Sequence, residues 1–193
     1  CDGNETRYAT EALLNLNAPS YLRLCRMAVD NVTDEIPGYK FELGKGFTMR
    51  DGGDATIIAC GLMVQEALKA AGMLAAEGIS ARVIDMHTIK PLDEELVVKA
   101  AQETGVIVTS EEHNVIGGLG AAVCECLSLR CPVPVVRHGV EDCFGRSGAA
   151  KKVLAAYGLT AEVLGLQRIQ RTKREYCTEH SAAGRGWRPA AFA

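Results

Sequence analysis

The alternation of apolar runs with amphipathic runs constrains the fold of this chain more than any other feature. The predicted strands are 55–60, 81–86, 106–109 and 133–137. The predicted helices are 64–77, 93–104, 119–129, 147–157 and a further one from Thr160. Because the connections are short, the crossovers should be right-handed and most strands parallel. We therefore expect a three-layer α/β/α fold with a five-stranded, mixed and mainly parallel sheet.

The first 38 residues do not fit this alternation. An amphipathic helix is predicted over 5–16, a strand over 20–26 and a linker over 32–38. One helix and one strand cannot make a core, so residues 1–38 are interpreted as the remnant of a preceding α/β domain with its linker. A hairpin over 39–43 and 47–50 opens the main domain, 39–170. The basic segment 171–193 is predicted to be a disordered tail.

Composition excludes several classes of protein. The chain has 193 residues, 48% of them hydrophobic, and a formal net charge of −3, so nothing favours nucleic acid or a membrane as a partner. The sequence has no signal peptide and does not begin with Met, which suggests a fragment. Its eight cysteines fit buried free thiols in a reducing cytosol. The spacing of Cys124, Cys126 and Cys131 does not match a zinc site.

Residues 110–120 carry the most conspicuous polar pattern. Glu111, Glu112 and His113 follow a predicted strand, and Gly117 and Gly118 precede a predicted helix. Ligands often bind at such strand ends, so an acid/base cluster or a metal site is one interpretation. The favoured alternative is a structural loop or a subunit contact. The glycines do not form a dinucleotide-binding fingerprint.

Four other polar residues stand at or just after predicted strand ends. His87 begins the connection between a strand and a helix, and neither its role nor that of Lys90 is explained by local structure. Arg23 and Arg26 end the first predicted strand. A guanidinium group there suits a phosphate or carboxylate, although a surface ion pair is the simpler interpretation. No nucleoside-triphosphate loop and no nucleophile elbow occur.

Several segments, in their order, carry a resemblance to a known family. They are 18–26 (APSYLRLCR), 41–46 (FELGKG), 54–61 (DATIIACG), 87–93 (HTIKPLD), 111–113 with 117–120 (EEH, GGLG), 142–148 (DCFGRSG) and 157–160 (YGLT). Together they resemble the C-terminal part of transketolase-type thiamine-diphosphate enzymes, and in particular the C-terminal subunits of split transketolases. The resemblance extends from about Asp2 to Arg168.

The resemblance implies the end of the family's pyrimidine-binding module followed by its C-terminal domain. The complete enzyme would use thiamine diphosphate and Mg²⁺ to move a two-carbon ketol unit between sugar phosphates. This chain alone would bind neither and would be inactive, because the diphosphate module and the activating glutamate lie elsewhere. The implied partners are an N-terminal diphosphate-binding subunit or domain and a sugar phosphate, in a cytoplasmic homodimer or heterotetramer.

The resemblance assigns substrate-phosphate binding to Arg26, with Arg23 as a second candidate. It assigns no catalytic residue and no metal ligand, and it favours a structural or interface role for Glu111, Glu112, His113, Gly117, Gly118 and His87. Two other functions stay open. One is a non-catalytic dimerisation or regulatory domain, and the other is the same domain of a deoxyxylulose-phosphate synthase or of a 2-oxoacid dehydrogenase.

Overall fold

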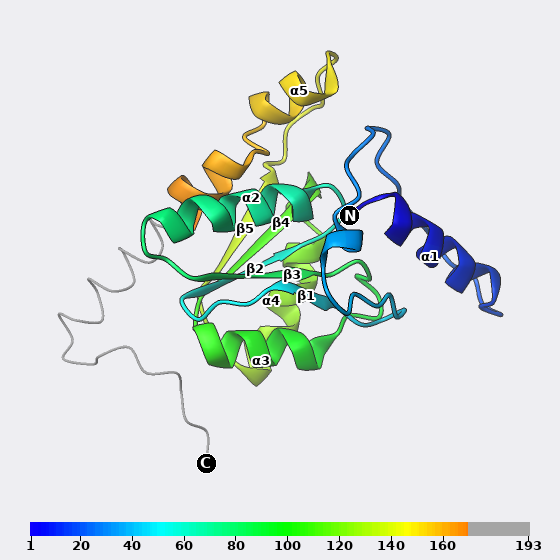
Figure 1. Ribbon diagram of the computed structural model, residues 1–193, viewed down its shortest axis with the longest axis horizontal. Coiled ribbons are helices and arrows are strands. Elements are labelled where there is room, and N and C mark those ends of the chain that lie inside the picture. Colours follow the sequence, from blue (N-terminus) through cyan, green and yellow to red (C-terminus); the bar gives the residue numbers. More distant parts are fainter. Residues whose placement is uncertain (170–193) are drawn as a thin grey trace.

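A computed structural model describes residues 1–169 of the chain, apart from the side chains of 166–168. The predicted tail 171–193 lies outside the described residues. Five strands form one sheet in the order β1-β3-β2-β4-β5 (Figure 1). They are β1 (Phe47–Arg50), β2 (Ala55–Ala59), β3 (Ala81–Asp85), β4 (Ile107–Asn114) and β5 (Val135–Val140). Only β1 runs antiparallel to its neighbour, so the predicted mixed and mainly parallel sheet is confirmed.

Helices cover both faces of the sheet, as the alternation predicts. On one face lie α2 (Met63–Ala76) and the helical segment η2 (Val163–Ile169), and on the other lie α3 (Glu94–Thr104) and α4 (Leu119–Arg130) (Figure 1). Successive strand residues alternate between the two cores: Ile57 packs with the α2 side and Ile58 with the α3 side. Both side chains are fully buried, which is why the central strands read as continuous apolar runs.

Local sequence signals explain the limits of α3 particularly well. The Asp93 side chain accepts a hydrogen bond from the backbone N–H of Leu96, as an N-cap residue should. Gly105 ends the helix with a φ of 67°, a conformation that glycine adopts without strain. The predicted helix over 93–104 is thereby confirmed to within one residue.

The N-terminal segment differs from the prediction. Helix α1 (Gly3–Leu14) forms close to the predicted range, and a single 3-10 turn, η1 (Thr33–Glu35), lies in the predicted linker. The predicted strand over 20–26 is wrong for this structure, because the segment has no regular secondary structure. A strand is stabilised by a neighbour, and within residues 1–169 none lies beside this one. Figure 1 shows α1 directed away from the sheet.

The predicted hairpin is also wrong in its first half. Residues 39–43 form no strand, and β1 pairs with β3 instead. The turn that follows them is held by side chains of the loop after β3: the N–H of Gly44 donates to Thr88 and that of Gly46 to Asp93. These side-chain acceptors satisfy two backbone donors of the turn and hold it against the loop after β3.

The later elements keep their predicted order but shift their limits. Strand β4 continues to Asn114, five residues beyond the predicted end, and β5 begins and ends later than 133–137. Helix α5 (Ala150–Ala156) starts three residues after the predicted Ser147 and extends away from the body of the fold (Figure 1). No helix within residues 1–169 is long and apolar enough to span a bilayer.

Candidate functional site

Glu111 is a buried carboxylate inside β4 that caps the next helix. It is 1% exposed, and its two oxygens accept hydrogen bonds of 2.8 Å from the backbone N–H groups of Leu119 and Gly120. These donors belong to the first turn of α4, whose own N-cap residue, Gly118, has no side chain to offer. The capping group is thus supplied from eight residues upstream, across the strand-to-helix turn. Both oxygens of Glu111 are occupied by α4, which gives this residue a structural role.

Gly118 makes room for that carboxylate. A Cβ atom at this position would overlap Oε2 of Glu111, far inside van der Waals contact. Gly117, just before it, has a φ of 74°, in the left-handed region that favours glycine. The two glycines therefore serve different needs, one a close approach and the other a backbone conformation.

Glu112 and His113 stand at the outer end of β4. Glu112 is half-buried and His113 is exposed. The Nδ1 atom of His113 lies 2.9 Å from the carbonyl oxygen of Asn114, a contact within its own segment. The structure does not bring these two side chains together with Glu111 around a cavity. Their role in a subunit contact stays a prediction.

His87 packs into the loop that follows β3. Its ring stacks on Phe41, with 4.3 Å between the ring centroids, and its Nδ1 lies 2.9 Å from the hydroxyl of Thr88. Burial lowers the pKa of His87, although the nearby Asp85 acts in the opposite direction. This environment favours a neutral, structurally engaged imidazole.

Arg23 and Arg26 lie on the surface, and only Arg23 is engaged. Nη2 of Arg23 donates a 2.9 Å hydrogen bond to the backbone carbonyl of Glu112. The structure thus brings the irregular segment 20–26 to the outer end of β4, and two regions that the sequence singled out separately are neighbours. Arg26 is exposed and makes no hydrogen bond or ion pair with any residue in the described part of the chain. Its guanidinium group is available to an anion.

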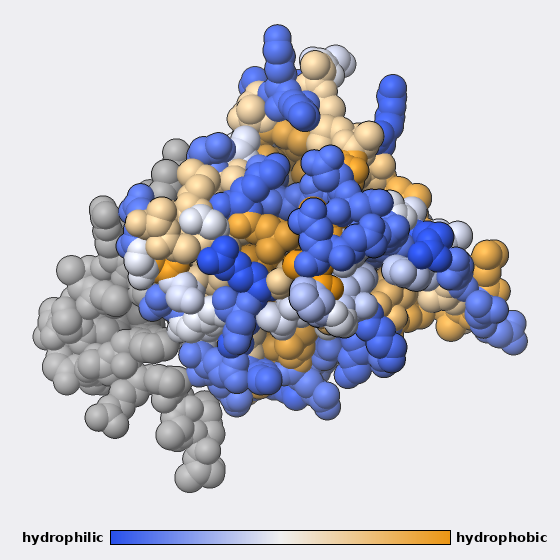
Figure 2. All heavy atoms as spheres, viewed as in Figure 1, coloured by the Kyte–Doolittle hydropathy of each residue, from blue (hydrophilic) through white to orange (hydrophobic). Residues whose placement is uncertain are grey.

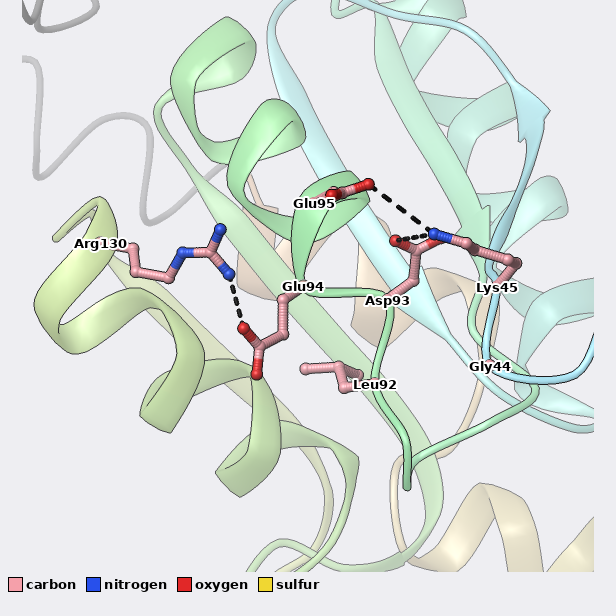
Figure 3. A pocket seen from close by; sticks show the side chains of 7 residues that line it. All are labelled: Gly44, Lys45, Leu92, Asp93, Glu94, Glu95 and Arg130. Atoms are coloured by element: carbon pink, nitrogen blue, oxygen red, sulfur yellow. Dashed lines mark hydrogen bonds and ion pairs between the residues drawn. The ribbon is translucent and has the colours of Figure 1, made fainter.

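An open pocket of about 290 Å³ lies where the loop before β1 meets the start of α3 and the end of α4 (Figure 3). Nζ of Lys45 is 3.7 Å from a carboxylate oxygen of Asp93 and 3.7 Å from one of Glu95. Arg130 pairs with Glu94 at 2.5 Å. The charged side chains of this pocket pair with one another, so the pocket does not indicate a particular ligand.

The sequence analysis did not predict one further group of polar side chains. Cys1, Glu5 and Asp85 are all buried, and their potential ligand atoms lie within 4.8 Å of one another. Burial, followed by the neighbouring carboxylate of Asp85, raises the pKa of Glu5 to about 10. Eighty residues separate Glu5 from Asp85, so no spacing motif signals this cluster. The one available signal was an aspartate that follows the apolar pair Val83 and Ile84 near the end of the predicted strand 81–86.

The matching family is described as transketolase, C-terminal domain, and its sequence model covers residues 44–164. The chain belongs to the transketolase C-terminal domain family. The match begins inside the predicted main domain, 39–170, and leaves the N-terminal 43 residues outside it. The fold expected from the resemblance and the predicted family are thus both confirmed.

Relatives extend the similarity into the N-terminal segment. The chain is 47% identical over 164 residues to a 6-deoxy-6-sulfo-D-fructose transketolase subunit (SqwH) of Clostridium sp. strain MSTE9, covering 83% of the chain and 49% of the relative. It is 46% identical over 162 residues to an apulose-4-phosphate transketolase subunit of Phocaeicola vulgatus. That alignment covers 84% of the chain and 51% of the relative. A 1-deoxy-D-xylulose-5-phosphate synthase of Heliobacterium modesticaldum is 39% identical, over 83% of the chain and 25% of the synthase.

A solved structure shows the same arrangement. A split-gene transketolase, described as an inactive β4 tetramer, superposes with a TM-score of 0.82 at 46% identity, covering 90% of this chain and 57% of that one. The chain therefore spans about half the length of these two transketolase subunits and of the split-gene transketolase chain.

The described residues do not fit a thiamine diphosphate site. Both oxygens of the buried Glu111 are used by α4. Glu5 accepts a 3.0 Å hydrogen bond from Tyr39 beneath the N-terminal segment. Among residues 1–169, both buried glutamates are therefore already engaged within the fold, and neither is assigned to a cofactor.

Proposed function

We propose that this chain is the C-terminal part of a transketolase that transfers a two-carbon ketol unit between sugar phosphates and that is inactive without its other half. The observation that carries the proposal is the similarity, at 46–47% identity, to two transketolase subunits of which the chain covers only about half. The resemblance implies that thiamine diphosphate with Mg²⁺ performs the covalent chemistry in the complete enzyme. What this chain contributes is substrate binding and a surface for assembly.

Arg26 is the residue proposed to hold the substrate phosphate. Its exposed guanidinium group has no partner within the described residues, and a charge-assisted, bidentate contact to a phosphate suits it. Arg23 is less suited, because its guanidinium already donates to the carbonyl of Glu112. We assign Arg23 to anchoring the segment that carries Arg26.

Residues 1–38 are proposed to belong to the preceding pyrimidine-binding module and its linker. Their exposed apolar side chains support this division: Leu14 is 81% exposed, Tyr21 87% and Leu24 55%. Figure 2 shows hydrophobic atoms at the surface along the N-terminal arm, the projecting part of residues 1–38. Such side chains suit contact with the rest of a domain or with a partner subunit.

The proposed partner is an N-terminal subunit or domain that binds the diphosphate, in a homodimer or a heterotetramer. The word "subunit" in the names of both relatives and the tetramer of the split-gene transketolase support an assembly of separate chains. A cytoplasmic location belongs to the same proposal, since free thiols such as those of Cys60 and Cys126 are typical of reducing compartments.

The proposed reaction can be tested by asking which two-carbon donor substrate the complete enzyme uses. The chain would be combined with its diphosphate-binding partner, thiamine diphosphate and Mg²⁺, and offered either a ketose phosphate or pyruvate with an aldose phosphate acceptor. We expect transfer from the ketose phosphate and no release of carbon dioxide from pyruvate. Pyruvate-dependent release of carbon dioxide would instead favour the deoxyxylulose-phosphate synthase or 2-oxoacid dehydrogenase alternative.

A further inference from the structure

Glu112 lies where β4 extends past the end of its neighbour β2. The last paired residues of these two strands are Ala59 and Ser110, and β4 continues to Asn114 without β2 beside it. The pairing of β4 with β5 is also irregular between Ser110 and Asn114. Glu112 is therefore matched with no residue of either strand, and unlike Glu111 it does not cap α4.

A segment from far away in the sequence contacts Glu112 at this point. Nη2 of Arg23 donates a 2.9 Å hydrogen bond to the backbone carbonyl oxygen of Glu112. The thiol of Cys25 is hydrogen-bonded to the carboxylate of the same residue, and burial together with this carboxylate raises the pKa of the thiol. Glu112 thus accepts a hydrogen bond through its main chain and another through its side chain, both from one short segment.

The sulfur of Cys25 also shapes the chain around Arg26. The N–H of Met27 donates to Sγ of Cys25 at 3.3 Å, and the chain bends at Arg26 and Met27. Beyond the bend the segment joins the body of the fold, because Met27 and Val29 pack against the core on the α2 side. Arg26 therefore stands between two attachments, one to the outer end of β4 and one to the core.

Polar contacts rather than burial hold the segment that precedes the bend. Every residue from 14 to 26 is exposed, so packing contributes little to its position. Residues 17–22 make no hydrogen bond with any other residue of 1–169. The contacts with Glu112 are therefore the first ones after α1 that restrict the freedom of the chain leading to Arg26.

We propose that Glu112 and Arg23 are positioning residues for the substrate phosphate, because they hold segment 23–27 on the outer end of β4 and so fix the place of Arg26. This inference rests on the phosphate role given to Arg26 in the proposed function. A guanidinium group that is already held loses less freedom when it binds an anion, so the contacts with Glu112 strengthen binding without touching the substrate. The C-terminal domain thereby takes part in substrate binding through the strand end that its sequence made conspicuous.

Steady-state kinetics of the complete enzyme test the two positioning residues. Arg23→Ala should raise KM for a phosphorylated acceptor about fivefold, and leave kcat and KM for an unphosphorylated acceptor within about twofold. Glu112→Ala should raise the first KM about threefold, because a thiol is a weaker donor than a guanidinium group. Glu112→Gln keeps an acceptor for the thiol and should resemble the wild type. Glu125→Ala removes an exposed carboxylate of α4 and serves as the control.

A double variant separates positioning from direct phosphate binding by Arg23. If Arg23 acts through Arg26, adding Arg23→Ala to Arg26→Ala should leave KM for the phosphorylated acceptor where Arg26→Ala alone puts it. A direct contact of Arg23 with the phosphate would make the two increases multiply, and that result would overturn the proposal.

Tryptic cleavage of the 193-residue chain after Arg26 gives a readout that needs no activity. In Arg23→Ala and Glu112→Ala this bond should be cut about fivefold faster than in the wild type, while the thermal unfolding temperature stays within about 2 °C. Cleavage at the wild-type rate would overturn the proposal, and so would an unchanged KM in Arg23→Ala where Arg26→Ala raises it. If Arg26→Ala itself leaves KM for the phosphorylated acceptor unchanged, the phosphate role in the proposed function fails, and the positioning role fails with it even where cleavage is faster.

Discussion

At the scale of single residues, the structure separates residues that hold the fold from those free to meet a ligand. Glu111 looked like a candidate acid or base in sequence, but both of its oxygens cap α4. Arg26, at the other end of the described chain, has an exposed charge with no partner among residues 1–169. Sequence alone could not make this distinction for Glu111, because the donors it binds lie eight and nine residues later across a turn.

Gly118→Ala tests the close approach between the β4–α4 turn and Glu111. The new Cβ would overlap Oε2 of Glu111, so the carboxylate must move and two buried N–H groups lose their acceptor. We expect the free energy of unfolding, measured by urea denaturation, to fall by about 2 to 4 kcal/mol. Gly53→Ala is the control, since nothing lies within 4 Å of its Cβ position. Equal effects of the two substitutions would contradict the role of Gly118.

Arg26→Ala tests phosphate binding in the complete enzyme. Losing a charge-assisted contact should raise KM for a phosphorylated acceptor by roughly 10- to 100-fold, and KM for an unphosphorylated acceptor by less than about threefold. Steady-state kinetics with both acceptors would measure the difference. Arg7→Ala removes an exposed arginine that pairs with Glu11 on α1 and should change neither value. Equal changes for both acceptors in Arg26→Ala would remove Arg26 from this role.

At the scale of elements, prediction succeeded where a local signal decides the structure. Asp93 and Gly105 mark both ends of α3, and the apolar runs locate β2 to β4. Prediction failed where the structure of a segment depends on contacts with residues outside that segment. Residues 20–26 have strand-like alternation but no neighbouring strand within the described residues. Residues 39–43 form no strand, and the turn after them is held by the loop after β3, to which Gly44 and Gly46 donate. The extension of β4 to Asn114 depends on β5, which its own polar sequence does not reveal.

Asp93→Ala tests how α3 is anchored. Asp93 accepts hydrogen bonds from the N–H groups of Leu96 and Gly46, so it both caps the helix and holds the loop before β1. We expect a loss of about 2 kcal/mol in the free energy of unfolding, measured by thermal or urea denaturation. Glu95→Ala removes a neighbouring, highly exposed carboxylate that also pairs with Lys45, and should cost less than about 0.5 kcal/mol. A cost for Asp93→Ala as small as that would show that the cap contributes little.

At the scale of the whole molecule, a well-packed three-layer domain carries an N-terminal arm with an exposed apolar surface. The family match covers 44–164, whereas the exposed apolar side chains of Leu14, Tyr21 and Leu24 precede it. The sequence predicted this division from the absence of enough elements to make a second core. The division itself is part of the proposed function, as are the partner subunit and the cofactor that it would bring.

The rate of ketol transfer by the chain alone and by the complete enzyme tests the central claim most directly. The 193-residue chain would be assayed with thiamine diphosphate, Mg²⁺, a ketose phosphate donor and an aldose phosphate acceptor, before and after addition of its diphosphate-binding partner. The account predicts no transfer above the background rate from the chain alone, and transfer that saturates as the partner approaches a one-to-one ratio. Transfer by the pure chain, or no transfer with the partner present, would contradict it.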